Sequence, residues 1–361
     1  MSSSAVPSLG LESFPLELLA CPVCHAGLQA TDTQLQCTGC SRSYPVDGGV
    51  PMLFVPDDPN VHPDDVTDVV KAFYEEHPFP NYDDIDSDSS LAEKAQRGVL
   101  ARLMDEQIPR NARVLEVGCG TGQLSNFLGM QSSRRVIGSD MCLHSLRLAK
   151  DFRDRWRIKG ANFMQMNLFK PPLKTASFDV VMSMGVLHHT ADPRGAFESI
   201  ARVLKPGGFI IIGLYNKIGR LPTDLRRFLF KVGGDTLSFL DSHMRDKRYN
   251  DERKRAWFLD QYKHPHESKH TFSEVITWFE ANGVEYISSI PKVEGGAFTD
   301  KEKLFEPHPK GTKTSRFFTD LEMLLTGGDD GALFVTIGRK LPEVSGRTET
   351  LPQAVVQKRA S

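Results

Sequence analysis

The stretch that indicates the fold of this chain most clearly is Val114-Leu-Glu-Val-Gly-Cys-Gly-Thr-Gly-Gln123. Its first residues are typical of a buried strand, and Gly118, Gly120 and Gly122 separate that strand from a helix-like run. Glycines let the backbone approach a ligand closely, and the start of a helix offers free amide donors. The spacing G-x-G-x-G, with Glu116 ahead of it, differs from the G-x-G-x-x-G of dinucleotide loops. The stretch therefore predicts a ligand-binding turn of another kind.

Strand-like and helix-like segments alternate around this turn. Strands are predicted at 113–117, 135–140, 161–166, 178–184, 208–215, 284–290 and 332–338. Helices are predicted at 91–107, 123–129, 143–157, 194–203 and 273–281. Strands that alternate with crossover helices indicate an α/β fold with a doubly wound, mainly parallel sheet.

The string Leu115-Glu-Val-Gly-Cys-Gly-Thr-Gly122 resembles motif I of the class I S-adenosylmethionine (SAM)-dependent methyltransferases. The resemblance covers about residues 94–340 and implies a Rossmann-like, seven-stranded sheet. It also implies that Asp140 accepts the ribose hydroxyls, that Met141 packs against adenine, and that Asn167 takes a place that is frequently Asp. The full set of cofactor-binding residues that it implies is Glu116, Gly118, Gly120, Gly122, Asp140, Met141, Asn167 and Met184.

Two histidines follow the fourth strand, in the string Leu187-His-His-Thr-Ala-Asp-Pro193. Methyl transfer aligns a nucleophile with the methyl group and often removes a proton, which a neutral histidine can accept. Because this strand end lies beside the methyl group in the family, His188 and His189 are the candidate catalytic residues. The alternative is that one of them caps a helix or bonds a backbone carbonyl.

Sequence features also limit the classes of molecule that are expected to accept the methyl group. No Asn/Asp-Pro-Pro-Tyr/Phe string, typical of enzymes that methylate nucleobase or amide nitrogens, follows the fourth strand. The strings after the fourth and before the fifth strand resemble those of small-molecule C- and O-methyltransferases. Nearby, His266-Glu-Ser-Lys-His270 matches the zinc-protease pattern H-E-x-x-H, but Pro265 precedes it and no apolar helix flanks it. The run 260–271 is instead interpreted as part of a substrate pocket or as an ordered polar loop.

Four cysteines form two C-x-x-C pairs near the N-terminus: Cys21, Cys24, Cys37 and Cys40. Four thiolates satisfy tetrahedral Zn²⁺ and leave no position for a reacting water, so the predicted site is structural. The predicted zinc ribbon spans residues 13–55. Residues 14–55 also resemble the small zinc-ribbon proteins that partner and activate methyltransferases of the translation machinery, with the string Tyr44-Pro-Val-Asp-Gly-Gly-Val-Pro-Met-Leu53 as a further shared feature.

The remaining segments connect or decorate these two units. Residues 56–93 are interpreted as an acidic linker whose aromatic run 73–82 either closes over the cofactor or docks the linker. The methyltransferase unit is expected over 94–340, with insertions at about 217–270 and 291–331. Residues 341–361 are expected to be disordered. The segment 217–255 holds eleven Lys/Arg against six Asp/Glu, mixed with apolar residues, and suits an anionic substrate, a tRNA backbone, a membrane surface or a solvated face.

Composition is that of an ordinary globular chain, with 361 residues, 40% apolar residues and a formal charge of −2. No apolar run has membrane-spanning length and no secretion signal is evident, so a cytoplasmic location is expected. The leading prediction is a SAM-dependent methyltransferase acting on a small-molecule or lipid-like acceptor, with peripheral membrane contact among its expected interactions. The alternatives are a methyltransferase of tRNA or of a translation protein, and a non-catalytic SAM-binding module.

Overall fold

The computed structural model describes residues 9–57, 65–80, 82, 85–247, 250–326 and 331–342. Within these residues, one sheet holds the strands β1 (Leu28–Ala30), β2 (Gln34–Cys37), β3 (Ser43–Asp47), β4 (Val50–Leu53), β5 (Arg113–Val117), β6 (Arg135–Asp140), β7 (Ala161–Met166), β8 (Phe178–Met184), β9 (Leu204–Tyr215), β10 (Val284–Ile290) and β11 (Leu333–Lys340). The helices are α1 (Thr67–Glu76), α2 (Asp88–Arg97), α3 (Val99–Gln107), α4 (Gln123–Gly129), α5 (Leu143–Arg155), α6 (Pro193–Ala201), α7 (Leu221–Gly233), α8 (Ser242–Arg245), α9 (Asp251–Phe258), α10 (Phe272–Ala281) and α11 (Lys313–Thr326).

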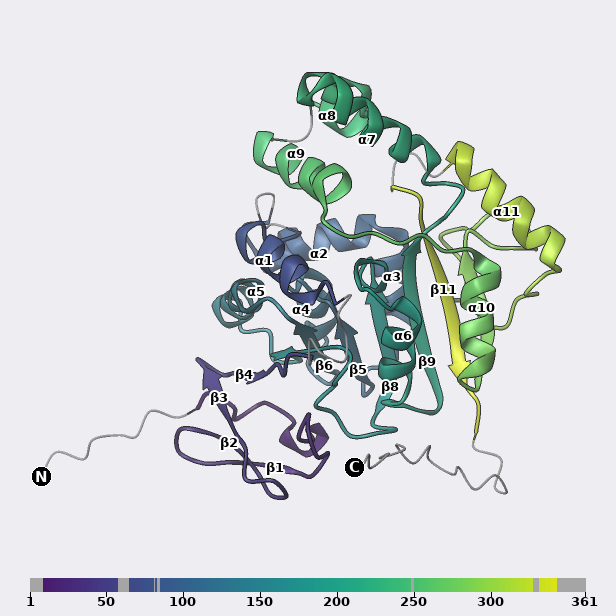
Figure 1. The fold of residues 1–361 in the computed structure, drawn as a ribbon. Coiled ribbons are helices and arrows are strands. Elements are labelled where there is room, and N and C mark those ends of the chain that lie inside the picture. The colour runs from purple at the N-terminus through teal and green to yellow at the C-terminus, as the bar shows by residue number, and fades with distance from the viewer. Residues whose placement is uncertain are drawn as a thin grey trace, which may run out of the picture.

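The seven strands predicted from the sequence form the body of the sheet, in the order β7-β6-β5-β8-β9-β11-β10 (Figure 1). Pairs from β7 to β9 are parallel, and β11 runs antiparallel to both β9 and β10. The predicted Rossmann-like fold is confirmed. Within this body the chain forms β5 first and then adds β6 and β7 on one side of it. It next crosses to the other side of β5 to form β8, so the direction in which strands are added reverses between β5 and β8. Such a reversal opens a crevice at the carboxyl ends of the strands, where α/β proteins bind ligands.

Helices cover both faces of the sheet and enclose two hydrophobic clusters. One cluster contains α6 and α10 residues such as Phe197 and Ile276, and the other contains α4 and α5 residues such as Phe127 and Phe152. Successive residues of β8, Val181 and Met182, belong to opposite clusters, as the alternation of side chains along a strand requires. Both faces of the central strands are therefore buried, which explains their nearly continuous apolar sequences.

The N-terminal ribbon is joined to the edge of the main sheet. Strand β4 pairs in parallel with β7, placing Met52 opposite Gln165 and Leu53 opposite Met166. A further bridge links Leu19 to Leu173. The ribbon and the helix-covered sheet thus share one hydrophobic cluster, whereas sequence patterns had suggested two units joined by a linker.

Two helical segments differ from their sequence predictions. The helix predicted over 91–107 is two helices, because Gly98 adopts an extended conformation between α2 and α3 (φ −81°, ψ 110°). Helix α2 begins earlier than predicted because Ser87 and Ser90 form a capping box. The segment interpreted as a linker contains α1 as well as α2. Of the tail predicted to be disordered, residues 343–361 lie outside the described residues.

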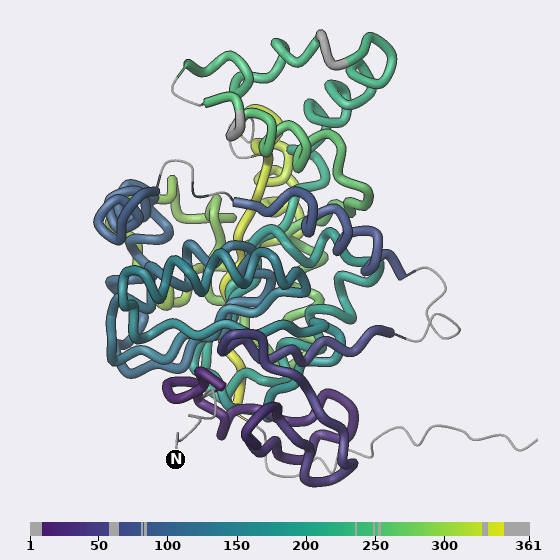
Figure 2. The backbone as a smooth tube through the Cα atoms, turned by 90° about the vertical axis from the view of Figure 1, so that its left-hand side faces the viewer, coloured from purple at the N-terminus to yellow at the C-terminus, as the bar shows by residue number. Residues whose placement is uncertain are grey.

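The insertion between β9 and α10 carries α7, α8 and α9. These helices lie at the opposite end of the molecule from the N-terminal ribbon in two perpendicular views (Figures 1 and 2). Helix α1 lies beneath α9 in this view (Figure 1). None of the described helices combines the length and apolar composition needed to cross a bilayer.

Candidate functional site

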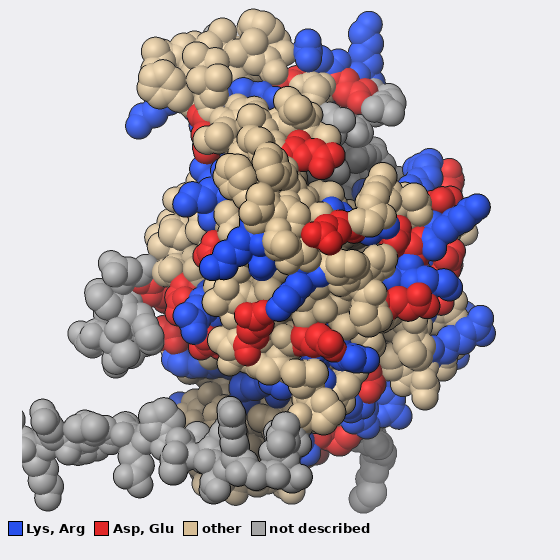
Figure 3. Space-filling view, turned by 90° about the vertical axis from the view of Figure 1, so that its right-hand side faces the viewer, with Lys and Arg blue, Asp and Glu red and all other residues tan. Residues whose placement is uncertain are grey.

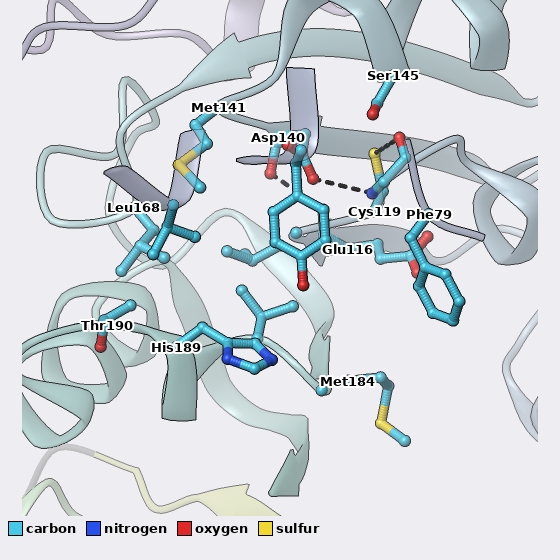
Figure 4. A pocket seen from close by; sticks show the side chains of 18 of the residues that line it. Phe79, Glu116, Cys119, Asp140, Met141, Ser145, Leu168, Met184, His189 and Thr190 are labelled. Atoms are coloured by element: carbon cyan, nitrogen blue, oxygen red, sulfur yellow. Dashed lines mark hydrogen bonds between the residues drawn. The ribbon is translucent and has the colours of Figure 1, made fainter. Parts of the chain in front are cut away.

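A cavity of about 470 Å³ lies at the carboxyl ends of the central strands, at the reversal of strand order. The glycine turn after β5 and the ends of β6 and β8 form its base. Its walls come from the ribbon (Phe54), the α1 segment (Tyr74, Phe79) and the insertion (Trp257, Asp260). Figure 4 shows Asp140 and Met141 on one side of the cavity, with His189 and Met184 on the other.

The glycine turn has the conformation that its sequence predicts. Gly118, Gly120 and Gly122 have φ values of 72°, 52° and 73°, which side chains other than glycine rarely adopt. A Cβ atom at Gly118 would collide with Val186, and one at Gly120 would collide with the carbonyl oxygen of Phe79. Gly118 and Gly120 line the cavity, whereas Gly122 starts α4 and packs against Phe163.

Asp140, at the end of β6, is held by the backbone of two turns. Its Oδ2 accepts a hydrogen bond from the Gly120 amide (2.9 Å), and its Oδ1 accepts one from the Cys142 amide (2.8 Å). Burial raises the pKa of Asp140, while these amide bonds lower it. The carboxylate therefore lies in the cavity wall with a fixed orientation and lone pairs left for a ligand's hydroxyl groups.

A second buried carboxylate, Glu116, lies directly before the glycine turn. The hydroxyl of Ser125 donates to its Oε2. Burial raises the pKa of Glu116 to about 7, although the bond from Ser125 lowers it. A ligand that donates hydrogen bonds or carries positive charge would favour the ionised form of this group.

The other predicted cofactor residues also lie at the cavity. Met141 and Met184 contribute thioether side chains from the ends of β6 and β8. Asn167 lines the cavity after β7, but its polar atoms already have partners in the chain: its amide donates to the carbonyl of Val55 and to Asp57 (both 3.0 Å), and its oxygen accepts from the Phe169 amide (2.9 Å). Asn167 thus ties the end of the ribbon to the β7 loop.

The two candidate histidines have different environments. The ring of His189 lines the cavity, and its Nδ1 lies 2.9 Å from the carbonyl oxygen of His266. Because a carbonyl only accepts, Nδ1 carries the proton of the neutral ring, and Nε2 is left with its lone pair. Burial lowers the pKa of His189 to about 4, although the His266 bond raises it.

His188 does not line the cavity. Its ring is fully buried, and its centroid lies 4.1 Å from the ring of Tyr215. Neither of its ring nitrogens has a hydrogen-bond partner among the described residues. Burial lowers the pKa of His188 well below its ordinary value, so the ring is neutral.

A buried ion pair shapes the wall that the insertion contributes. Arg220 binds Glu267 through two hydrogen bonds, from Nε (3.0 Å) and Nη2 (2.7 Å), and its guanidinium lies 3.8 Å from the Tyr215 ring centroid. Burial raises the pKa of Glu267, but Arg220 and Arg227 together hold it at about 2. The predicted run 260–271 thus begins in a short helical turn (Leu259–Lys263) and continues as an ordered loop anchored by Arg220, and its residues Asp260 and Gln261 line the cavity.

The aromatic run before β5 closes part of the cavity. The hydroxyl of Tyr74 donates to Oδ1 of Asp260 (3.1 Å), linking α1 to the insertion. The hydroxyl of Tyr82 donates to the carbonyl of Thr121 in the glycine turn (2.8 Å), and its ring stacks on Phe152. Tyr74 and Phe79 therefore line the cavity, while Tyr82 docks the segment on the turn.

Several cavity residues were not predicted from the sequence. Tyr215 ends the predicted fifth strand, and residues at the carboxyl end of a central strand commonly line the crevice. Its place in the sequence could therefore have predicted that it lines the cavity. Phe54 and Trp257 reach the cavity only through the pairing of β4 with β7 and the folding of the insertion, which no local pattern reveals.

The four cysteines form a cluster whose geometry fits a metal ion. Their Sγ atoms all lie within 4.8 Å of one another, with 3.7 Å between Cys21 and Cys40 and 3.4 Å between Cys24 and Cys37. Tetrahedral Zn²⁺ with bonds of about 2.3 Å places sulfur atoms about 3.8 Å apart. The hydroxyl of Tyr44 lies 3.1 Å from the Cys21 sulfur and supports the cluster from outside. Four thiolates close the coordination shell, so zinc here would be structural.

Comparisons with known proteins agree with this geometry. Residues 115–212 match the family described as "Methyltransferase domain", and residues 14–49 match "Trm112p-like protein". An uncharacterized protein of Synechococcus sp. is 27% identical over 62% of this chain, and the match spans 60% of that protein's length. An O-methyltransferase of Aspergillus nomiae is 31% identical over 48% of this chain and 80% of its own. A tRNA (carboxymethyluridine(34)-5-O)-methyltransferase of Arabidopsis thaliana is 29% identical over 30% of this chain and 26% of its own.

The glycine turn, the carboxylate at the end of β6 and the matches to the methyltransferase family all describe the same region of the fold. The N-terminal match and the cysteine cluster likewise coincide. The chain belongs to the SAM-dependent methyltransferases and carries a Trm112p-like region at its N-terminus.

Proposed function

We propose that the chain transfers a methyl group from SAM to a small-molecule or lipid-like acceptor inside the cavity. The observation that carries this proposal is the shape of the site: one cavity extends from the glycine turn to His189 under a roof formed by α1 and the insertion. Its lining is rich in apolar and aromatic side chains, and the carboxylates of Glu116, Asp140 and Asp260 lie among them. Such enclosure suits an acceptor that enters whole, with apolar surface to bury.

SAM supplies an electrophilic methyl group on a sulfonium when it is bound. We assign its binding to the glycine turn, Glu116, Asp140 and Met141. The ordered carboxylate of Asp140 suits the ribose hydroxyls, and Met141 supplies an apolar surface for adenine. The backbone at Gly185 leaves open space beside the end of β8, since a Cβ built there meets nothing within 4 Å. This opening is the proposed place where an acceptor meets the methyl group.

His189 is the proposed general base. Its Nδ1–H is fixed by the carbonyl of His266, so the unprotonated Nε2 is available to accept a proton from an acceptor hydroxyl or acidic carbon. Because the pKa of His189 is lowered to about 4, its ring is neutral at pH 7 and its Nε2 carries no proton. For His188 we propose a packing role instead, because its ring contacts Tyr215 outside the cavity.

A tRNA or a translation protein is the second candidate acceptor. The Trm112p-like region and the partial similarity to a tRNA methyltransferase favour it. Against it stands the roof over the cavity, which an acceptor base or side chain on a macromolecule would have to displace. The bond between Tyr74 and Asp260 is one contact that would have to open.

The test uses SAM with a labelled methyl group, incubated with the purified chain and an extract of cells lacking its gene. Organic-soluble material, small polar molecules, RNA and protein are then separated and counted. Label in the organic or small-molecule fraction, lost in His189→Ala while SAM still binds, supports the proposal. Label in RNA or protein assigns the second candidate, and absence of label from every fraction with SAM bound contradicts both.

A further inference from the structure

Helix α7 exposes an apolar stripe on its outer side. Leu221, Leu225, Phe228 and Val232 are each 53–73% exposed. Successive helix residues are about 100° apart, so these four positions fall within about 60° of the helix surface. Large apolar side chains that gather in one narrow stripe, rather than singly, mark an interaction surface.

A second exposed stripe runs along α11. It contains Phe317, Phe318, Leu321 and Leu325, and Leu325 is 87% exposed. The two helices are neighbours, because Gly219, just before α7, packs on the backbone and Cβ of Met323 in α11. We call these eight residues of α7 and α11 the apolar face.

The inner side of α7 already packs against other residues of the chain. The exposed apolar residues on its outer side are therefore not required for the hydrophobic core. Phe230 packs on Phe258 and Tyr262, with ring centroids 5.6 and 4.8 Å away. Arg227 donates to the carbonyl of Gln261 and to Glu267. The inner side of α7 therefore packs within the chain through Phe230 and Arg227, and the four apolar residues of the outer side are not needed for that packing.

The insertion that carries α7 has an excess of exposed positive charge, while α11 exposes one basic and one acidic side chain, Lys313 and Glu322. Among the described charged side chains of residues 217–255, five exposed ones are basic, while the only exposed acidic one is Asp251; the basic ones are Lys217, Lys231, Arg245, Lys247 and Arg255. Figure 3 views the molecule from the side of α10 and α11 and shows uncharged atoms over much of its upper part, with both basic and acidic side chains at the margins. This local excess of cations contrasts with the formal charge of −2 for the whole chain.

We propose that the apolar face docks the chain on an anionic lipid bilayer. Apolar side chains would enter the boundary between headgroups and acyl chains, and the surrounding cations would contact anionic headgroups. A nucleic acid would use the cations but would leave the exposed Leu and Phe residues in water. A second copy of the chain docked on the same face would bring two positively charged insertions together, and their like charges would repel each other.

The docking surface is linked to the wall of the cavity through helix α7. The segment 257–262 packs on the inner side of α7, and its residues Trp257, Asp260 and Gln261 line the cavity. Docking through α7 would hold this wall at the membrane surface, where a lipid-like acceptor resides. The inference extends the proposed function, but membrane binding itself requires no acceptor and is tested without one.

The experiment measures sedimentation of the full chain with vesicles of phosphatidylcholine alone and of phosphatidylcholine with phosphatidylglycerol at a ratio of about 3:1. The wild type is expected to bind the anionic vesicles at least tenfold more tightly than the neutral ones. Leu225→Ser with Phe228→Ser, and separately Phe317→Ser with Leu325→Ser, should each weaken binding at least tenfold. Val69→Ser with Leu148→Ser, which removes exposed apolar groups from α1 and α5, is the matched control and should bind as the wild type does.

The outcomes separate docking from transfer. SAM affinity, measured on the same samples, should be equal in all variants and reports that the cavity is intact. Wild-type chain that stays in the supernatant with anionic vesicles overturns the proposal, as does undiminished binding by both stripe variants. A concentration-dependent dimer that the stripe variants abolish, without vesicle binding, assigns the face to a second copy and also overturns it. Failure of methyl transfer alone leaves the docking result unaffected.

Discussion

Replacing Asp140 by asparagine is expected to weaken SAM binding by about 10- to 150-fold. Both carboxylate oxygens accept backbone amides, from Gly120 at 2.9 Å and from Cys142 at 2.8 Å. The amide group of asparagine has one NH₂, which must face one of these two donors. The substitution therefore removes a charge-assisted acceptor from the glycine turn and from the ribose hydroxyls that we propose to bind there. Hydrogen bonds to charged groups contribute about 1.5–3 kcal/mol, and this range gives the stated loss of affinity.

The assay is calorimetric titration with S-adenosylhomocysteine, which avoids turnover. Asp192→Asn is the matched control, because Asp192 caps α6 through a 2.9 Å bond from the Gly195 amide and lies outside the cavity. Asparagine caps helices as well as aspartate does, so this variant should bind as the wild type does. An Asp140→Asn variant with affinity within twofold of the wild type, or an equal loss in Asp192→Asn, would refute the role assigned to Asp140.

Three further predictions concern the ring at the cavity, the buried ion pair and the cysteines. Below pH 6.5 the unfolded chain protonates His189 while the folded ring stays neutral to about pH 4, so His189 alone should contribute a loss of about 1.4 kcal/mol of unfolding free energy per pH unit as the pH falls through this window; urea unfolding of His189→Asn at several pH values should show a dependence of the unfolding free energy on pH that is smaller by that amount, and an unchanged dependence contradicts the assignment. Arg220→Ala removes one of the two arginines that bind the buried Glu267 and leaves only Arg227 as its ion-pair partner, so it should cost about 3 kcal/mol in the same assay, the low end of the range for a broken buried pair, whereas a cost below about 1 kcal/mol would show that the pair is not buried in solution. A chelator should release one zinc ion per chain and expose the ribbon to protease, and protein purified under reducing conditions without zinc would contradict the structural site.

The parts of the fold that follow local patterns were predictable. The glycine turn was predictable because only glycine adopts its backbone angles without strain. Glycines at these positions therefore indicate the conformation of the turn. The seven strands were also predictable, since strands buried on both faces are continuous apolar runs between helical segments. In both cases the information lies within a few consecutive residues.

Features that depend on distant contacts were not predictable from local patterns. The ribbon strand β4 pairs with β7 more than a hundred residues away along the chain, and a short strand carries no sign of its partner. The break at Gly98 was missed because a single glycine within a helical pattern is compatible with a continuous helix.

The difference between His188 and His189 illustrates the same limit at the site. The two residues are adjacent, and both follow the same strand. A single 3₁₀ turn over Leu187–His189 directs the second ring into the cavity and the first against Tyr215. The sequence supplied the pair as candidates, and only the geometry of this turn separates them.

The most direct test of the account is a crystal structure of the full chain with S-adenosylhomocysteine. Density for the ligand is expected in the cavity between the glycine turn and His189, with its ribose hydroxyls hydrogen-bonded to Asp140 and its adenine against Met141. A ligand bound elsewhere, or a cavity that stays empty while calorimetry reports binding, would contradict it.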